Sequence, residues 1–135
     1  MKTSITKLVV TIAICGLGFV ARAQTIESMP PVVVKTVPEA GASNIAAGET
    51  EIKVTFSKEM QDKSWSLVGP VAGPDFGSSA KPRYDADHKT WILKVKLQPG
   101  TTYAYWLNHN RFQNFKDQQG HPAVPYLLSF KTASK

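Results

Sequence analysis

The sequence predicts an all-β fold, an antiparallel sandwich of about seven short strands. One observation is that apolar and polar residues alternate in several short segments, as they do in strands with one buried face. Another is that clusters of glycine, proline, asparagine and aspartate separate these segments. Beyond the first 23 residues, no segment has a useful apolar pattern of helical period, which disfavours helical and α/β folds.

Residues 1–23 have the three parts of a secretory signal peptide. Lys2 and Lys7 give a basic start, residues 8–21 form an apolar run, and Ala21-Arg22-Ala23 has the small-x-small pattern of a cleavage site. The run of about 14 residues is shorter than the roughly 20 that span a bilayer, so a retained anchor is the less favoured interpretation. We therefore expect cleavage after Ala23 and a secreted or periplasmic protein.

The predicted mature chain, residues 24–135, has the length of one domain. We expect a mobile leader over residues 24–31 and a single domain over residues 32–135. Cleavage removes the only cysteine, Cys15, so the domain must be stable without a disulfide. It leaves 13 basic and 10 acidic residues, a net charge of +3, which together with the compartment disfavours a nucleic-acid partner. No second long apolar run follows, so we expect no transmembrane segment in the mature chain.

The first two expected strands are residues 32–37 and 50–57. The former is rich in β-branched residues and stops at Pro38. In the latter, one face collects the apolar residues Ile52, Val54 and Phe56. Glycine-containing turn chemistry connects them.

The middle of the chain predicts three further short strands. Residues 65–68 form one, and the glycine- and proline-rich residues 69–82 form a loop after it. Residues 83–84 and 90–97 form two more, joined by a turn at residues 85–88. That turn, Asp-Ala-Asp-His, is disfavoured as a calcium site because lysines occupy the later ligand positions.

Lys53, Lys94 and Lys96 are expected on the outward faces of two strands that pair. They could form a basic stripe for an acidic polysaccharide or a lipid headgroup surface. The favoured interpretation is that they solvate the sheet and protect it from edge pairing.

The last two expected strands are residues 101–108 and 126–132, with a long loop over residues 110–125 between them. In the former, a period of two places Tyr103, Tyr105 and Leu107 inward. The same period places Ala104, Trp106 and Asn108 outward.

Three motifs in order carry a resemblance to a known family. VKTVPEAGASNIAAGETEIKVTFSKEM has a valine-rich strand, a Pro-x-x-Gly turn and a strand ending in Phe-Ser, with a methionine three residues beyond. LQPGTTYAY has the Leu-x-Pro-Gly-Thr-x-Tyr entry to a late strand. NFKDQQGHPAVPYLLSFKT has an Asp-x-x-Gly-x-Pro loop and a strand closing in Phe-x-Thr. Over nearly all of residues 31–132 the chain thus resembles bacterial Ig-like domains of the surface-layer SbsA type.

This resemblance implies a seven-stranded Ig-like sandwich without catalytic residues. Such modules generally act as spacers, adhesion units or accessory domains of secreted bacterial proteins. The residues agree at one corner, where Pro99 and Gly100 precede Tyr103. In sandwich domains a tyrosine near the start of a late strand can bond through its hydroxyl to the backbone of the preceding corner.

No catalytic motif is present in the sequence. It lacks Gly-x-Ser-x-Gly, His-Glu-x-x-His, a phosphate-binding glycine loop and Cys-x-x-Cys. We therefore expect no enzyme activity and no cofactor.

Asp117 and His121 are weak candidates for a metal site. Their loop, with the Pro-Glu-Ala-Gly turn, has a more distant similarity to CopC-like periplasmic copper-binding Ig-like proteins, and nitrogen ligands suit Cu(II). That family also uses an N-terminal histidine, whereas this mature chain would begin at Gln24. We favour the interpretation that Asp117 orders its own turn and that no metal binds.

An outward tryptophan beside amide, imidazole, guanidinium and aromatic groups would make a platform for stacking a sugar. These candidate ligand-binding residues are Trp106, Asn108, His109, Arg111, Phe112 and Phe115. The competing interpretation is that Trp106 packs under the long loop, which Phe112 and Phe115 anchor.

The favoured function is a non-catalytic interaction module whose partner is an unidentified protein or a cell-envelope glycan. The first alternative is a carbohydrate-binding module that uses the residues around Trp106. The second alternative is a periplasmic copper-binding protein. The sequence does not predict the oligomeric state.

Overall fold

The computed structural model describes residue 18 and residues 21–135, so most of the predicted signal peptide lies outside the described residues. A short 3₁₀ turn, η1 (Ile26–Ser28), precedes seven strands in this part of the chain. The strands are β1 (Val33–Val37), β2 (Gly48–Phe56), β3 (Leu67–Ala72), β4 (Arg83–Tyr84), β5 (Thr90–Leu97), β6 (Thr102–Leu107) and β7 (Tyr126–Lys131). None of the helices in this part is long and apolar enough to cross a membrane.

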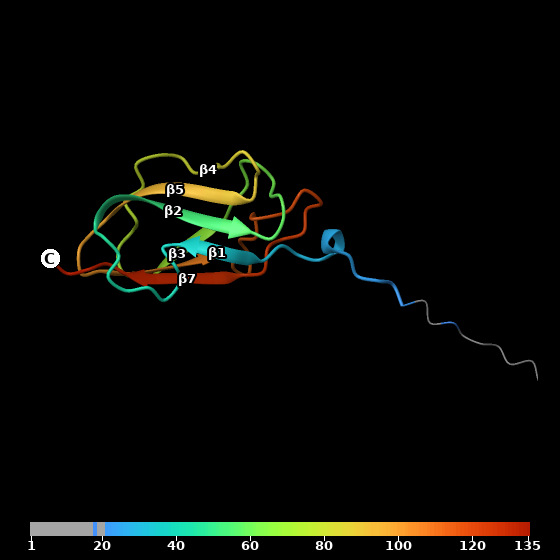
Figure 1. The fold of residues 1–135 in the computed structure, drawn as a ribbon, viewed down its shortest axis with the longest axis horizontal. Helices are drawn as coiled ribbons and strands as arrows, with labels where there is room; N and C mark the ends of the chain where they lie inside the picture. The colour runs from blue at the N-terminus through green and yellow to red at the C-terminus, as the bar shows by residue number, and fades with distance from the viewer. Residues whose placement is uncertain (1–17, 19–20) are drawn as a thin grey trace, which may run out of the picture.

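The strands form two stacked antiparallel sheets, as Figure 1 shows. One sheet has the order β1-β2-β5-β4 and the other has the order β3-β6-β7. The predicted all-β, Ig-like sandwich is therefore confirmed. The N-terminal segment leaves the sandwich at the end where the loop between β6 and β7 lies, and the C-terminus lies at the opposite end (Figure 1).

The core lies between the two sheets, where the alternating apolar residues meet. Ile52, Val54 and Phe56 of β2 each have 1% of their surface exposed or less. Every second residue of β5 and β6 joins them, as a period of two requires. These buried residues are Trp91, Leu93, Val95 and Leu97 of β5 with Tyr103, Tyr105 and Leu107 of β6.

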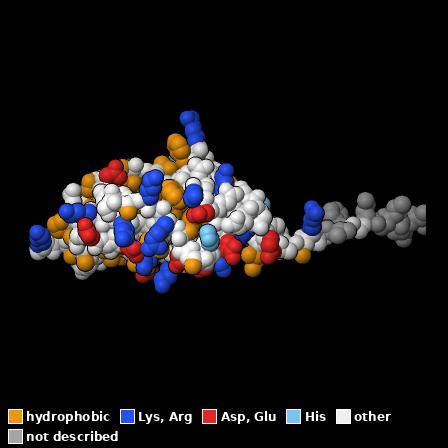
Figure 2. All heavy atoms as spheres, turned by 90° about the horizontal axis from the view of Figure 1, so that it is seen from above, with side chains coloured by type: hydrophobic (Ala, Val, Ile, Leu, Met, Phe, Trp, Pro, Cys, Tyr) orange, Lys and Arg blue, Asp and Glu red, His pale blue; other side chains and the backbone are white. Residues whose placement is uncertain are grey.

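The outer face of the first sheet carries mixed charge, with basic and acidic side chains side by side (Figure 2). Lys94 lies opposite Glu51 and Lys96 lies opposite Glu49 across β2 and β5. Lys53 Nζ also lies 3.4 Å from a Glu51 carboxylate oxygen. Cross-strand pairs of opposite charge stabilise a sheet. The three lysines are exposed, as expected, but they do not form a uniformly basic stripe.

The third strand differs from its prediction. Residues 65–68 were expected in a strand and Gly69 in a loop, whereas β3 runs from Leu67 to Ala72. The Gly69-Pro70 pair favours a turn, but β3 is an edge strand, where proline is tolerated. Its pairing with β6 shifts register between Val68 and Ala72.

The segment after β3 is held down by an aromatic residue. Phe76 is buried and stacks on Tyr105 with ring centroids 4.1 Å apart. The Tyr105 hydroxyl accepts a hydrogen bond from Phe76 N at 3.2 Å and donates one to Asp75 Oδ1 at 2.6 Å. Burial, assisted by the bond to Asp75, raises the pKa of Tyr105 well above its usual value. The predicted loop over residues 69–82 therefore contributes to the core.

The expected corner contact is present. The Tyr103 hydroxyl accepts a hydrogen bond from Gln98 N at 2.8 Å, and the Tyr103 side chain is fully buried. Thr132 Oγ1 donates to Gln98 O at 2.6 Å and accepts from Thr101 N at 2.9 Å. The corner at Pro99-Gly100 is thus tied to both β6 and the end of the chain.

Replacing Tyr103 with phenylalanine should destabilise the fold. The substitution leaves Gln98 N without its acceptor, which costs about 1–3 kcal/mol when the group is shielded from water. Urea unfolding at neutral pH measures the change, with Tyr126→Phe as the control because Tyr126 is only half buried. Equal unfolding midpoints for Tyr103→Phe and the parent chain would contradict this role.

Candidate functional site

The long loop after β6 starts at Asn108, which turns into the interior. Its backbone is left-handed, with φ 58°, a conformation that asparagine tolerates better than most residues. Its fully buried side chain donates from Nδ2 to Phe115 O (2.9 Å) and Ala123 O (3.0 Å), and its Oδ1 accepts from Phe115 N (2.9 Å). The prediction that Asn108 faces outward toward a ligand is wrong, because the left-handed residue breaks the period of two.

Phe115 anchors the same loop in the core. It is fully buried, and its ring centroid lies 5.2 Å from that of Phe56 and 5.4 Å from that of Trp91, edge-on to the indole. Phe115 therefore cannot contact a ligand as predicted. The anchoring interpretation holds for Phe115 but not for Phe112, which is 57% exposed.

Four of the six predicted ligand-binding residues remain at the surface. Trp106 is partly exposed on the outer face of its sheet, opposite Val68 on β3. The His109 ring lies 5.2 Å from the Trp106 ring. His109 and Phe112 exchange two backbone hydrogen bonds of 2.9 and 2.7 Å, which close a short hairpin with Arg111 exposed at its tip. We call residues 109–112 the loop hairpin.

The second half of the loop is ordered by a buried ion pair. Asp117 is fully buried, and its Oδ2 lies 2.5 Å from Lys58 Nζ, whose side chain is 10% exposed. Asp117 Oδ1 accepts from Gln119 N (3.0 Å) and His121 N (2.8 Å), while Oδ2 lies 3.0 Å from His121 Nδ1. Burial alone would raise the pKa of the Asp117 carboxyl, but the bonds from Lys58 and His121 outweigh it and lower that pKa.

This geometry bears on the weak metal candidates. The Asp117 carboxylate is engaged by an ammonium group and two backbone N–H groups, as expected for a residue that orders its own turn. Within residue 18 and residues 21–135, no three His, Cys, Asp or Glu side chains are grouped to hold a metal ion. The Asp117 carboxylate beside His121 is already neutralised by Lys58, so this geometry gives the metal interpretation no support.

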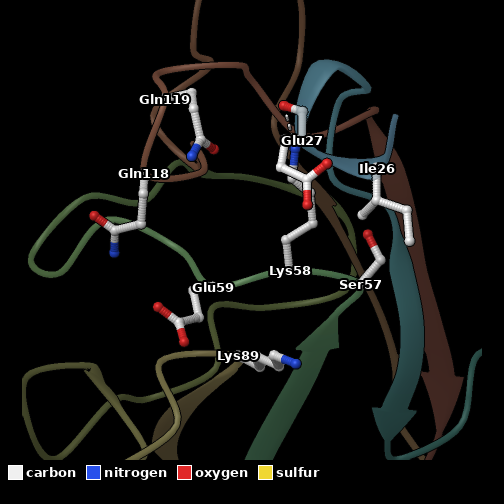
Figure 3. Close-up of a pocket in the computed structure, with 8 residues that line it drawn as sticks. All are labelled: Ile26, Glu27, Ser57, Lys58, Glu59, Lys89, Gln118 and Gln119. Carbon is white, nitrogen blue, oxygen red and sulfur yellow. Dashed lines mark hydrogen bonds between the residues drawn. The ribbon is translucent and has the colours of Figure 1, made fainter. Parts of the chain in front are cut away.

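Lys58 also holds the N-terminal segment. Its ammonium donates to Glu27 O at 3.2 Å and to Met29 O at 2.6 Å. Figure 3 shows Lys58 reaching toward the Glu27 segment, with Gln118 and Gln119 on the neighbouring turn. These segments enclose a cleft of about 410 Å³, which Glu59 and Lys89 also line. The cleft has mixed charge, and its central ammonium is already satisfied by protein groups.

A second hollow was not predicted from the sequence. A groove of about 470 Å³ is bordered by edge strand β3, the segment before β4, and the loop after the hairpin. Among its lining residues are Trp65, Ser66, Ser78, Trp91, Phe112 and Asn114. The only sequence signal was the apolar character of residues 65–68, because the groove depends on the tertiary approach of distant segments. Phe112 belongs to both the groove and the loop hairpin.

Replacing Asn108 with alanine should destabilise the chain and open the loop. The change leaves two buried backbone groups, Phe115 N and Ala123 O, without partners, so we expect a loss of at least about 2 kcal/mol in unfolding free energy. Urea unfolding and limited proteolysis within residues 109–125 measure both effects. The control is Asn114→Ala, where the side chain is exposed and a change within about 0.5 kcal/mol is expected. Indistinguishable effects of the two variants would contradict this role of Asn108.

Replacing Asp117 with asparagine should remove part of the acid sensitivity of folding. The folded-state pKa lies below the unfolded value of about 3.9, so this carboxylate stabilises the fold above about pH 4. That stability is lost as the pH falls through the folded-state pKa. At pH 7 the substitution leaves Lys58 without its counter-ion, which costs about 3 kcal/mol. Urea unfolding measures both effects between roughly pH 2 and pH 7, a range that covers the titration of the Asp117 carboxyl.

The matched control for this pair is Glu59→Gln, which removes an exposed carboxylate that lines the same cleft. It should change the unfolding free energy by less than about 0.5 kcal/mol. A parent-like acid slope in Asp117→Asn would show that the Asp117 carboxylate does not contribute to it.

Comparison with known protein families identifies one that matches most of this chain. The family described as Bacterial Ig-like domain matches residues 27–132. No curated protein matches the chain. Domains of this family are typically found in surface or secreted proteins and are usually non-catalytic. Because the match spans most of the sequence and agrees with the two-sheet architecture, the chain belongs to the bacterial Ig-like domain family.

Proposed function

We propose that this protein is a secreted or periplasmic, non-catalytic Ig-like module of the surface-layer type that binds another component of the cell envelope. The observation that carries this proposal is the loop hairpin, which presents Arg111 and Phe112 beside the partly exposed Trp106. Arginine and aromatic residues dominate the binding energy of protein interfaces.

The support beneath the hairpin favours recognition. Phe115 is packed in the core, Asn108 bonds three backbone groups, and Asp117 is paired with Lys58. Asn108 directly precedes the loop hairpin, and Phe115 and Asp117 follow it. A pre-ordered loop loses less conformational entropy on binding than a flexible one. The surface is therefore suited to a specific partner, a protein or a glycan.

The proposed compartment rests on residues 1–23. Their basic start, apolar run and Ala21-Arg22-Ala23 site have the order of a secretory signal peptide. Expression of the full chain with its own N-terminus should give a mature protein that begins at Gln24. Mass spectrometry of the periplasmic and extracellular fractions measures this, and an uncleaved chain in the cytoplasm would contradict the proposed compartment.

The two alternative functions differ in their support. The Asp117 carboxylate gives copper binding no support, because Lys58 already binds it. Carbohydrate binding by the six predicted residues loses Asn108 and Phe115, both fully buried. It gains the groove beside Phe112 as a different location for a sugar.

The proposed contact surface can be tested by charge reversal. Purified mature protein is sedimented with cell envelopes of the organism that carries the gene, and the bound fraction is measured against concentration. Arg111→Glu should weaken retention about tenfold or more, because it inverts the charge at the hairpin tip. Lys131→Glu, an equal charge reversal at the end of β7, should stay within about twofold of the parent chain.

Two results would contradict the proposal. If the parent chain shows no retention on envelopes, the envelope-binding function is wrong. If Arg111→Glu and Lys131→Glu weaken retention equally, the contact surface lies elsewhere.

A further inference from the structure

The groove bordered by β3 differs in charge from the cleft beside the N-terminal segment. Among the described residues that line it, none carries a charge. The cleft beside the N-terminal segment, in contrast, contains Glu27, Lys58, Glu59 and Lys89. A volume of about 470 Å³ lies within the range of small-molecule sites, roughly 300–1,000 Å³. The groove is therefore matched in size and charge to a neutral ligand.

Aromatic faces line this groove from two distant segments. Trp65, just before β3, is partly exposed, and Phe112 in the loop hairpin is 57% exposed. Large aromatic side chains contribute much apolar contact area in a fixed geometry. The carbon–hydrogen face of a pyranose ring is a flat apolar surface that fits against such a ring.

Polar groups in the groove retain hydrogen-bonding capacity. Ser66 Oγ accepts from Asn114 N at 3.0 Å, so its own hydroxyl proton can donate. Ser78 Oγ donates to Ala80 O at 2.8 Å, so its lone pairs can accept. The Asn114 side chain is exposed and offers both kinds of group. Sugar hydroxyls both donate and accept hydrogen bonds, so they can pair with Ser66, Ser78 and Asn114.

Trp91 adds an independent observation. It lines the groove although its side chain is fully buried. In the described part of the chain, no atom accepts a hydrogen bond from Trp91 Nε1. Buried indole N–H groups usually have an acceptor. This unpaired donor belongs to a residue of the groove lining but is itself shielded from solvent, so it marks an incompletely satisfied wall of the groove and not a ligand contact.

We propose that the groove between Trp65 and Phe112 is a saccharide-binding site that takes a segment of an uncharged polysaccharide. The inference rests on the proposed envelope-binding function, because it names the partner as a neutral glycan. An acidic polysaccharide would gain no cationic partner from the groove lining.

Isothermal titration calorimetry of the purified mature protein tests this with maltohexaose and cellohexaose as neutral probes, and with hexagalacturonate as the acidic probe. We expect at least one neutral probe to bind and hexagalacturonate to bind at least about tenfold more weakly. Trp65→Ala should weaken the neutral probe about tenfold or more, because the stacking surface is lost.

Val71→Ala is the control, because Val71 is 55% exposed on β3 and lies outside the groove lining, and it should stay within about twofold of the parent chain. Asn114→Ala removes an exposed groove amide without touching the core and should weaken binding about threefold. It keeps the test decisive if Trp65→Ala fails to fold, which circular dichroism and thermal unfolding report.

The inference is overturned if neither neutral probe binds or if the acidic probe binds as well as the neutral ones. It is also overturned if Asn114→Ala binds like the parent chain and Trp65→Ala either does the same or fails to fold. Envelope sedimentation separates this failure from that of the proposed function. Retention that Arg111→Glu removes and Asn114→Ala and Trp65→Ala leave unchanged would support the hairpin surface and reject the saccharide groove. Loss of retention in the groove variants, with release by free neutral oligosaccharide, would support both.

Discussion

The edge-on contact between Trp91 and Phe115 is the interaction on which most of this domain depends. Trp91 lies on β5, a central strand, whereas Phe115 belongs to the loop between β6 and β7. Their rings join the first sheet to a loop that starts from the second, and both side chains are fully buried. The same tryptophan lines the groove. Core packing, loop position and groove shape are therefore coupled through one pair of aromatic residues.

Buried polar contacts restrain the connections that the Trp91–Phe115 contact does not reach. The sequence has one cysteine, Cys15, outside the domain, so buried hydrogen bonds and an ion pair restrain the long connections. Asn108 joins the start of the loop to its middle and end. Lys58 joins the end of β2 to Asp117 and to the N-terminal segment. Each anchor satisfies backbone or charged groups that would otherwise be costly to bury.

The sequence was most informative where residues obey a simple period. β5 matches its predicted bounds, because alternation over Thr90–Leu97 is regular and turn residues flank it. The corner at Tyr103 also followed from local spacing. Asn108 could not be placed, because its orientation depends on one left-handed residue that alternation does not reveal. β3 extended past Gly69-Pro70 because edge position, a tertiary property, makes proline tolerable there.

The candidate sites show the same division. Arg111 and Phe112 were named as candidate ligand-binding residues from their chemistry, with Phe112 as a loop anchor in the competing interpretation, and both are exposed. The groove escaped prediction because Trp65 and Asn114 are 49 positions apart and meet only when β3 lies beside the folded loop. Aromatic residues in one loop thus divided between core and surface, and sequence spacing alone did not distinguish Phe112 from Phe115.

Separation of the hairpin tip from its anchors has an evolutionary consequence. The tip residues Asn110 and Arg111 are exposed, and neither side chain contributes to the hydrogen bonds of Asn108 or the ion pair of Asp117. Mutations at Arg111, whose backbone φ is not positive, can therefore accumulate without a large cost to folding. A domain built in this way can acquire a new binding preference by local sequence drift, while selection for foldability acts on a different set of residues.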